Sequence, residues 1–352
     1  MRFDKYEWIA ISIMVFLFIL VGFIQGWSVS LVILNMCIIS AIMTMGVNIS
    51  WGYAGVINFG VMGFLAMGGL AAVLVSYPPV KEAWHVGGSG LGISFVLLIA
   101  LVTAVYFITK LIEKKSHKYW LNGLVIFFGL IIIRYFFLNA TDRIEEVDPA
   151  LAGFLGGANL PIIFSWVVGG FFAGGVAFVI GKVALGLRSD YLAIVTLGIS
   201  EIVVSVLKHE EWLSRGVKNV IGLKRPVPYE INLQVSDWFI TMVTWFNSSK
   251  LNQIIDPDQK QQILNNLIID SSSLFVKLNY AILFFTVMIV IYYFANKAQI
   301  SPWGRMMRAI RDNEVSANAM GKDIVKQHLI IFVIGAAIVG VAGAMLVTLD
   351  GL

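Results

Sequence analysis

The sequence predicts an all-α, polytopic membrane protein: a transmembrane bundle of about nine spans with one cytoplasmic amphipathic helix. Of its 352 residues, 59% are hydrophobic and 13% are charged, whereas about 25% of the residues of a soluble domain are charged. A core of this size cannot enclose so much apolar surface, so the lipid bilayer must be the solvent for part of the chain. The apolar residues also gather in runs of about 20 residues, the length that crosses roughly 30 Å of hydrocarbon.

Nine apolar runs are long enough to span the membrane. They predict helices at 8–25, 28–48, 53–76, 91–111, 120–138, 163–185, 190–207, 278–296 and 328–349. The first run lacks a small-residue cleavage site, so we expect a retained span. The shorter run at 232–246 carries Asp237 and several aromatic residues, which favours a place at the membrane interface.

Basic residues predict the orientation of these spans. With the N-terminus inside, the short outer loops hold only Lys81 and Arg143, and most other basic residues of short loops lie inside. We therefore expect the loop at 297–327 to be cytoplasmic and the long loop at 208–277 to be extracytoplasmic. The net charge of +4 follows from this sidedness and does not indicate nucleic-acid binding.

Glycines within the spans predict close helix packing, and they include Gly169, Gly170, Gly174, Gly175, Gly335, Gly340 and Gly343. The stretch WGYAGVINFG at 51–60 differs because three glycines lie beside Asn58 at the entrance of a span. This pattern predicts an unwound or broken segment, which membranes tolerate where it is buried or lines a cavity. A role in a translocation path and a purely structural break are both consistent with it.

No motif for catalysis, nucleotide binding or metal binding is found. GVAFVIGK at 175–182 has five residues between its glycines and is followed by Val183, whereas a phosphate-binding loop needs four and then Ser or Thr. The single Cys37 excludes an internal disulfide and a cysteine metal site, and the four histidines are scattered. We predict a chain that is not an enzyme and has no catalytic residues, cofactor or metal.

Glu201 is the ionisable residue most clearly inside the membrane. It lies eleven residues beyond Asp190, about 16 Å along a helix and so near the bilayer midplane. A carboxyl group at this depth lines a path or holds a gate, or else it is a buried structural group that is paired or protonated. The sequence leaves both interpretations open.

The segment SPWGRMMRAIRDNEVSANAMG at 301–321 predicts a basic amphipathic helix. Ser301 can cap it, Pro302 suits its first turn and Gly321 suits its end. Arg308 and Asp312 have the spacing of an i,i+4 ion pair. The predicted apolar face comprises Met306, Ile310, Ala317 and Met320.

Two partners could take this basic amphipathic helix. It could lie on anionic lipid, or it could enter a groove on another protein. The small residues Ser316, Ala317 and Ala319 favour the protein groove.

Three stretches resemble the integral-membrane permeases of the branched-chain amino acid ABC importers, the LivM-like branch in particular. They are GYAGVINFG with the following GFLAMGGLAAV, LRSDYLAIVTLGISEIV at 187–203, and the segment at 301–321. The resemblance spans roughly 28–349 and implies that 1–352 is a single permease domain in the bacterial inner membrane.

The resemblance also implies partners and site residues. A second permease subunit would complete the pathway, cytoplasmic ATPase subunits would hydrolyse ATP, and a periplasmic binding protein would deliver substrate. The 301–321 segment resembles the family's coupling helix. It implies ATPase-contacting positions at Arg305, Arg308, Ala309, Ile310, Arg311, Glu314, Ala317 and Gly321. Positions in the matched membrane segments, weaker candidates for the translocation path, are Tyr53, Gly55, Asn58, Tyr191, Thr196 and Glu201.

The chain departs from the family's pattern in three places. An extra two-span segment at about 85–160 is inserted, and an insertion of two spans preserves the sidedness of everything after it. Ser316 stands where the family has alanine, and the substrate-associated loop appears only as RGVKNVIG at 215–222. The chain ends at Leu352, where relatives continue, so we expect a truncated or divergent product.

Alternative functions fit the same outline. A sister branch of the family carries urea and short-chain amides, so these are alternative substrates to branched-chain or related amino acids. A secondary transporter driven by an ion gradient is a further alternative, and it would need no ATPase.

Overall fold

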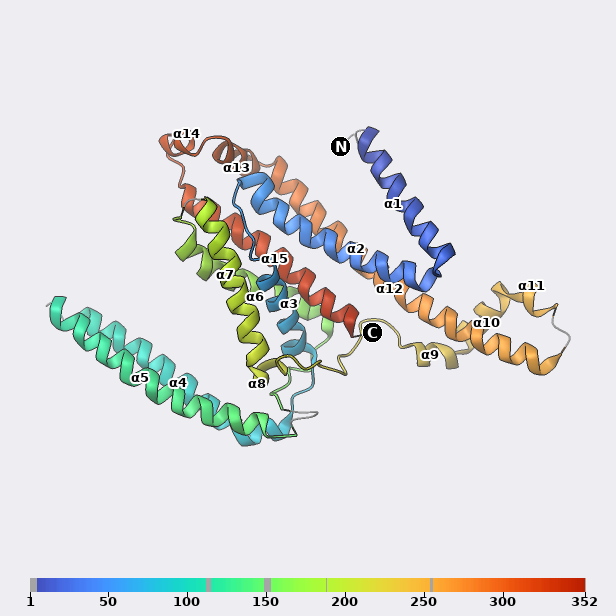
Figure 1. Ribbon diagram of the computed structural model, residues 1–352, viewed down its shortest axis with the longest axis horizontal. Coiled ribbons are helices and arrows are strands. Elements are labelled where there is room, and N and C mark those ends of the chain that lie inside the picture. The colour runs from blue at the N-terminus through green and yellow to red at the C-terminus, as the bar shows by residue number, and fades with distance from the viewer. Residues whose placement is uncertain (1–4, 112–114, 149–152, 188, 254–255, 352) are drawn as a thin grey trace. The chain divides into compact units, whose positions relative to one another are not determined.

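The structure is a computed structural model that describes residues 5–111, 115–148, 153–187, 189–253 and 256–351, without the side chains of residues 7, 115–116 and 189–190. Within these ranges the regular structure is helical (Figure 1). Its elements are α1 (Lys5–Ile24), α2 (Trp27–Asn48), the π-helical turn η1 (Ile49–Tyr53), α3 (Val61–Ser76), α4 (Lys81–Leu111), α5 (Lys115–Glu145), α6 (Ile162–Ala184), α7 (Ser189–His209), α8 (Glu211–Ser214), α9 (Glu230–Val235), α10 (Asp237–Phe246), α11 (Ser248–Leu251), α12 (Pro257–Ile300), α13 (Pro302–Asp312), α14 (Glu314–Ala319) and α15 (Ile324–Asp350).

Eight helical stretches among the described residues are long and apolar enough to cross a membrane. They confirm eight of the nine predicted spans, most of them with added turns, and so confirm a polytopic helical bundle. They are Trp8–Gln25, Trp27–Tyr53, Lys81–Leu111, His117–Glu145, Ile162–Ala184, Tyr191–His209, Pro257–Ile300 and Ile324–Asp350.

The ninth predicted span, 53–76, is only partly helical. Its helix α3 has 16 residues, which is about 24 Å of helix and less than the roughly 30 Å of hydrocarbon. Residues 55–60 precede it without helical structure, and an extended chain adds about 3.3 Å per residue. Helix α3 alone is therefore too short to span the hydrocarbon, and a crossing here needs the non-helical segment as well.

The described chain divides into two compact units. The first comprises 1–72, 161–201 and 223–352, and the second comprises 73–160 and 202–222. The second unit contains the segment that the sequence analysis identified as an insertion at about 85–160.

The core of the first unit lies where α2, α6, α12 and α15 meet. Helix α15 packs against α6 and α2, and α2 packs against α12 (Figure 1). Aromatic side chains fill part of this core, since the Trp166 and Tyr280 rings lie 5.8 and 5.5 Å from that of Phe284. Burial of such rings stabilises the contact between α6 and α12 by more than area alone.

Glycines bring the backbones of this core together, as predicted. A Cβ atom on Gly46 or on Gly335 would lie 2.6 Å from the other's carbonyl oxygen, so α2 and α15 touch there. Gly340 lies as closely against Gly169 on α6. Gly175 is an exception, because a Cβ there would meet nothing within 4 Å.

The second unit is built on an antiparallel pair, α4 and α5. Gly87 near the start of α4 lies against Ile144 near the end of α5, and Gly129 lies against Leu101. Each helix has 31 residues and is about 46 Å long, longer than the hydrocarbon is thick. Backbone hydrogen bonds of 2.9 Å from Ala158 to Leu74 and from Leu160 to Val75 bind the following chain to the end of α3.

Residues 208–277 contain more helix than the predicted loop implies. Helix α12 begins at Pro257, where Asp256 caps it, and continues for 44 residues through the predicted span 278–296. The predicted interfacial run 232–246 lies mostly in α9 and α10, and Trp245 and Phe246 at the end of α10 are each 70% exposed.

Candidate functional site

The chain breaks its helical path between α2 and α3. The π-helical turn η1 ends at Tyr53, and Gly55 has a φ of +72° in the left-handed region that glycine adopts readily. Two backbone bonds close the end of the turn, from Gly55 to Trp51 at 2.9 Å and from Val56 to Ser50 at 3.1 Å. The predicted broken segment is therefore confirmed.

Hydroxyl groups on α7 satisfy the backbone of this break. The Phe59 N–H donates to Thr196 Oγ1 at 3.1 Å, and the Gly63 N–H donates to Ser200 Oγ at 2.7 Å. The Gly60 N–H donates to Asn58 Oδ1 at 2.9 Å. Thr196 and Asn58, both predicted path residues, are thus buried supports of the break in this structure.

Ser200 is a support that the sequence analysis did not single out. It follows Thr196 by four residues, so both hydroxyls project from one face of α7. That spacing is the signal that could have identified it.

The opposite face of α7 is exposed. Tyr191 is 61% exposed, and Glu201 is exposed on the same side, as are Ile194 and Gly198 between them. No hydrogen bond or ion pair within the described residues engages the Glu201 carboxylate. Arg188 of the LRSDY stretch lies outside the described residues.

Tyr53 lines an apolar cavity. The cavity has a volume of about 410 Å³ and is formed by η1, α12, α13 and α15, with Ile49, Trp303 and Met307 in its lining. A second, more open hollow has a volume of about 550 Å³ and is lined by residues of α2 and η1, among them Thr44, Asn48, Trp51 and Gly52. Trp51 and Gly52 belong to the predicted broken stretch, whereas the sequence did not indicate Thr44 or Asn48.

Helix α13 begins as predicted and packs its apolar face onto the first unit. Ser301 Oγ accepts the Gly304 N–H at 3.3 Å, and Pro302 occupies the first turn. Met307 and Ile310 are fully buried, in one cluster with Ile49 and with Phe332 of α15. The orientation of the helix is therefore set by a buried stripe, and its polar side is exposed.

The predicted single helix over 301–321 is wrong. Asn313 leaves the helical conformation with φ −158° and ψ 98°, and its Oδ1 accepts the Ser316 N–H at 3.0 Å to begin α14. Asparagine side chains compete for backbone donors in this way and favour caps over helix interiors. Gly321, with a φ of +75°, follows α14 as the expected end signal.

The predicted pair between Arg308 and Asp312 is also absent from the described structure. Asp312 Oδ1 instead accepts bonds from the neighbouring Arg311, at 3.1 Å from Nε and 3.0 Å from Nη2. Arg311 Nη1 donates to the carbonyl oxygen of Gly52 at 2.7 Å, which holds its guanidinium beside Asp312.

The surface of α13 and α14 includes most of the predicted ATPase-contacting positions. The exposed ones are Arg305, Arg308, Ala309, Arg311, Glu314 and Gly321. Ile310 is buried and Ala317 is half-buried, so these two hold the helices in place. Met320, which the pattern placed on one apolar face with Ile310 and Ala317, is 81% exposed, as is Val315.

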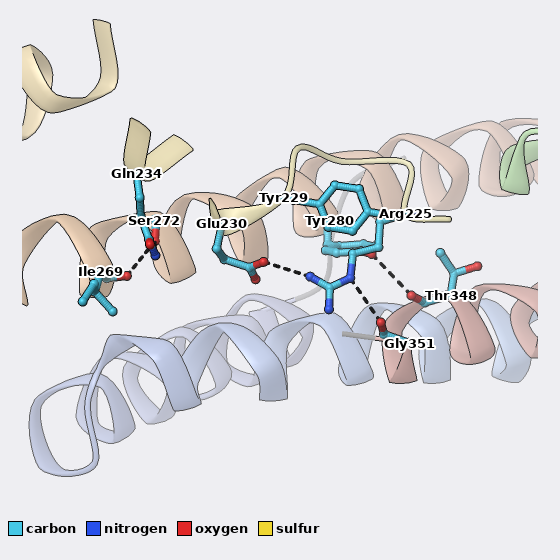
Figure 2. Close-up of polar contacts among 9 residues, drawn as sticks. All are labelled: Arg225, Tyr229, Glu230, Gln234, Ile269, Ser272, Tyr280, Thr348 and Gly351. Atoms are coloured by element: carbon cyan, nitrogen blue, oxygen red, sulfur yellow. Dashed lines mark hydrogen bonds and ion pairs between the residues drawn. The ribbon is translucent and has the colours of Figure 1, made fainter. Parts of the chain in front are cut away.

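A polar cluster at the C-terminal end of α15 ties the chain after α8 to α12 and α15 (Figure 2). Arg225 forms an ion pair with Glu230 at 2.9 Å, and its Nε donates to the Gly351 carbonyl at 3.1 Å. The Tyr280 hydroxyl donates to the Thr348 carbonyl at 3.4 Å, and the Trp166 indole donates to Thr348 Oγ1 at 3.0 Å. These bonds lie at the opposite end of α15 from α13.

Within the described residues, no three His, Cys, Asp or Glu side chains come together as metal ligands would. The candidate site comprises the break, which α7 and α13 both contact, and the exposed face of α13 and α14.

The chain matches a known protein family over most of its length. The family model described as the branched-chain amino acid transport system permease component matches residues 29–351. The chain belongs to this family. The match includes both the break and α13, so the resemblance seen in the three sequence stretches holds over most of the chain.

Individual relatives of this permease are more distant. The high-affinity branched-chain amino acid transport system permease proteins LivM of Escherichia coli and Salmonella typhimurium are 27% identical over 186 and 184 residues, which is 52% of this chain and 39% of each relative. A probable LivM permease of Methanocaldococcus jannaschii is 38% identical over 56 residues, 16% of each chain. The chain thus spans well under half the length of the E. coli and Salmonella relatives, and no solved structure matches it.

Proposed function

We propose that this chain is the membrane-spanning permease subunit of an ABC importer that carries branched-chain or related amino acids across a bacterial inner membrane. Separate cytoplasmic ATPase subunits bind it at α13 and α14 and supply the energy. A second permease subunit completes the pathway, and a periplasmic binding protein delivers the substrate on the outer side.

The exposed face of α13 and α14 is the observation that carries this proposal. Its buried stripe fixes α13 on the permease, while Arg305, Arg308 and Ala309 remain exposed. Val315 and Met320 add two exposed apolar side chains on or just after α14. Arginine and methionine side chains are enriched at protein interfaces. A helix that served only to lie on lipid would turn its apolar side chains outward to the bilayer, but Met307 and Ile310 face the protein.

The exposed face of α7 supports a polar path or a second subunit beside this chain. Glu201 lies on a membrane-spanning helix, where an ionised carboxyl group facing lipid is costly. A face that presents Tyr191 and Glu201 therefore fits contact with water or protein. Tyr191 and Glu201 remain our candidates for the path, whereas Asn58 and Thr196 support the break.

Uptake measurements test this function. Membrane vesicles that contain the full transporter should accumulate labelled leucine only when ATP and the binding protein are present, and vanadate should stop the uptake. Labelled urea is the comparison substrate, and urea uptake without leucine uptake would select the sister function. Uptake of leucine that needs an ion gradient and resists vanadate would contradict the proposal.

A further inference from the structure

The contact between α13 and the turn η1 joins the docking element to the break in the membrane path. Met307 and Ile310 of α13 are buried in the same cluster as Ile49, Ala54 and Val56 of the turn and break. Arg311 lies at the end of this contact, and its Cγ is 3.1 Å from where a Cβ on Gly55 would be. The helix and the break therefore touch through both apolar side chains and one cation.

Arg311 satisfies a carbonyl group at the end of the π-helical turn. The carbonyls of Trp51 and Ser50 accept bonds from Gly55 and Val56, whereas the Gly52 carbonyl accepts the Arg311 Nη1 bond of 2.7 Å. The last carbonyls of a helix need an outside donor, and a cation there also suits the helix dipole. The bond thus replaces a helix hydrogen bond that the break has removed.

Asp312 orients the guanidinium for this role. Its Oδ1 accepts from Arg311 Nε and Nη2, which leaves Nη1 directed at Gly52. Arg308, one turn earlier on α13, is exposed and makes no ion pair among the described residues. The two arginines therefore offer a direct comparison of an inward-bonded and a free cation on one helix.

We propose that Arg311 is a positioning residue that couples α13 to the break: its bond to the Gly52 carbonyl holds residues 49–56 in the turn, and displacement of α13 releases them. The effect on transport rests on the proposed function: an ATPase subunit bound to α13 would act on the break through Arg311. The bond itself is independent of that function.

Hydrogen exchange on the purified chain in nanodiscs tests the bond without any partner. Arg311→Ala should raise the exchange of the Gly55 and Val56 amides about tenfold, the scale expected for loss of a charge-assisted hydrogen bond. Arg311→Lys, which keeps the charge and N–H donors but loses the planar guanidinium, should restore part of the protection. Arg308→Ala should leave both amides within about twofold of the parent chain. Equal exchange in the Arg308 and Arg311 variants would overturn the proposal.

Asp312→Asn provides a second variant should Arg311→Ala fail to fold. It keeps the arginine but weakens the group that orients it, so exchange at Gly55 and Val56 should rise by a smaller factor. Unchanged exchange in this variant would contradict the role given to Asp312 and, with it, the coupling.

The assembled transporter then tests the consequence. Arg311→Ala should move several-fold less leucine per ATP hydrolysed than the parent chain, a ratio that a change in the amount of bound ATPase does not alter, whereas Arg308→Ala should lose ATPase binding. Full leucine transport per ATP in Arg311→Ala would overturn the coupling role. Failure of the parent chain to bind any ATPase would instead refute the proposed function. The role of the bond between Arg311 and Gly52 would then be judged from the hydrogen-exchange result alone.

Discussion

At the scale of single residues, two hydroxyl groups on α7 replace hydrogen bonds that a continuous helix would have supplied to residues 59–63. Thr196 Oγ1 accepts from Phe59 and donates to the Ala193 carbonyl at 2.9 Å, so its one donor and one of its two lone pairs are engaged. A buried N–H without an acceptor costs about 1–3 kcal/mol. These side chains therefore make the break tolerable inside a membrane protein.

Thr196→Val removes this acceptor and keeps the shape of the side chain. We expect a loss of about 1–3 kcal/mol, because the Phe59 N–H is left buried and unpaired. A lower apparent melting temperature in detergent and faster hydrogen exchange at Phe59 would measure it. Thr286→Val is the matched control, because Thr286 is exposed and bonds only to the Ile282 carbonyl of its own helix. Equal effects of the two changes would contradict the account of Thr196.

At the scale of elements, the sequence predicts which segments are helices better than where they end. Apolar runs identify the spans because burial in lipid needs uninterrupted apolar surface. They do not mark the additional turns of α4, α5 and α12, which are too polar to contribute to a hydropathy pattern. Asn313 is the clearest error, since a periodic pattern passes over a residue whose side chain caps a new helix.

Two glycines explain the close contact between the elements α6 and α15. Gly169 and Gly340 allow the backbones to touch, and a Cβ on Gly340 would also collide with Ala173. Neither collision is with a flexible side chain, so the helices would have to move apart.

Gly340→Ala should therefore destabilise the protein by about 1–3 kcal/mol despite alanine's higher helix propensity. Gly175→Ala is the control on α6, because its new Cβ meets nothing within 4 Å and the propensity gain of up to about 1 kcal/mol remains. Apparent melting temperatures of the two variants should move in opposite directions. A shift of the same sign in both would contradict the packing account.

At the scale of the whole molecule, the sequence predicts the family, the bundle and the broken segment. It does not separate residues that face a partner from residues that support the fold. Thr196 and Glu201 lie in the same matched stretch, yet one is 1% exposed and the other is exposed. The distinction depends on which side of α7 packs against the break, and that follows from tertiary contacts rather than from residue type.

The orientation of the chain is testable without any partner. Because Cys37 is the only cysteine, Cys37→Ser gives a background for single labelling sites. A membrane-impermeant maleimide should label Lys81→Cys on intact cells, and it should label Lys322→Cys only after the membrane is opened, as the distribution of basic residues predicts. The reverse labelling pattern would mean that the chain has the opposite orientation, with α13 on the outer side of the membrane.

Co-purification tests the central claim, that α13 and α14 form the docking surface for ATPase subunits, most directly. The solubilised permease should carry ATPase subunits at a fixed ratio, and Arg308→Glu should release them, because it reverses an exposed charge without touching the buried stripe of α13. Lys260→Glu is the control, a charge reversal of an exposed lysine at the start of α12, near the far end of that helix from α13. This control variant should retain the ATPase subunits while Arg308→Glu loses them. Retention of the subunits with full ATP hydrolysis in Arg308→Glu would contradict it.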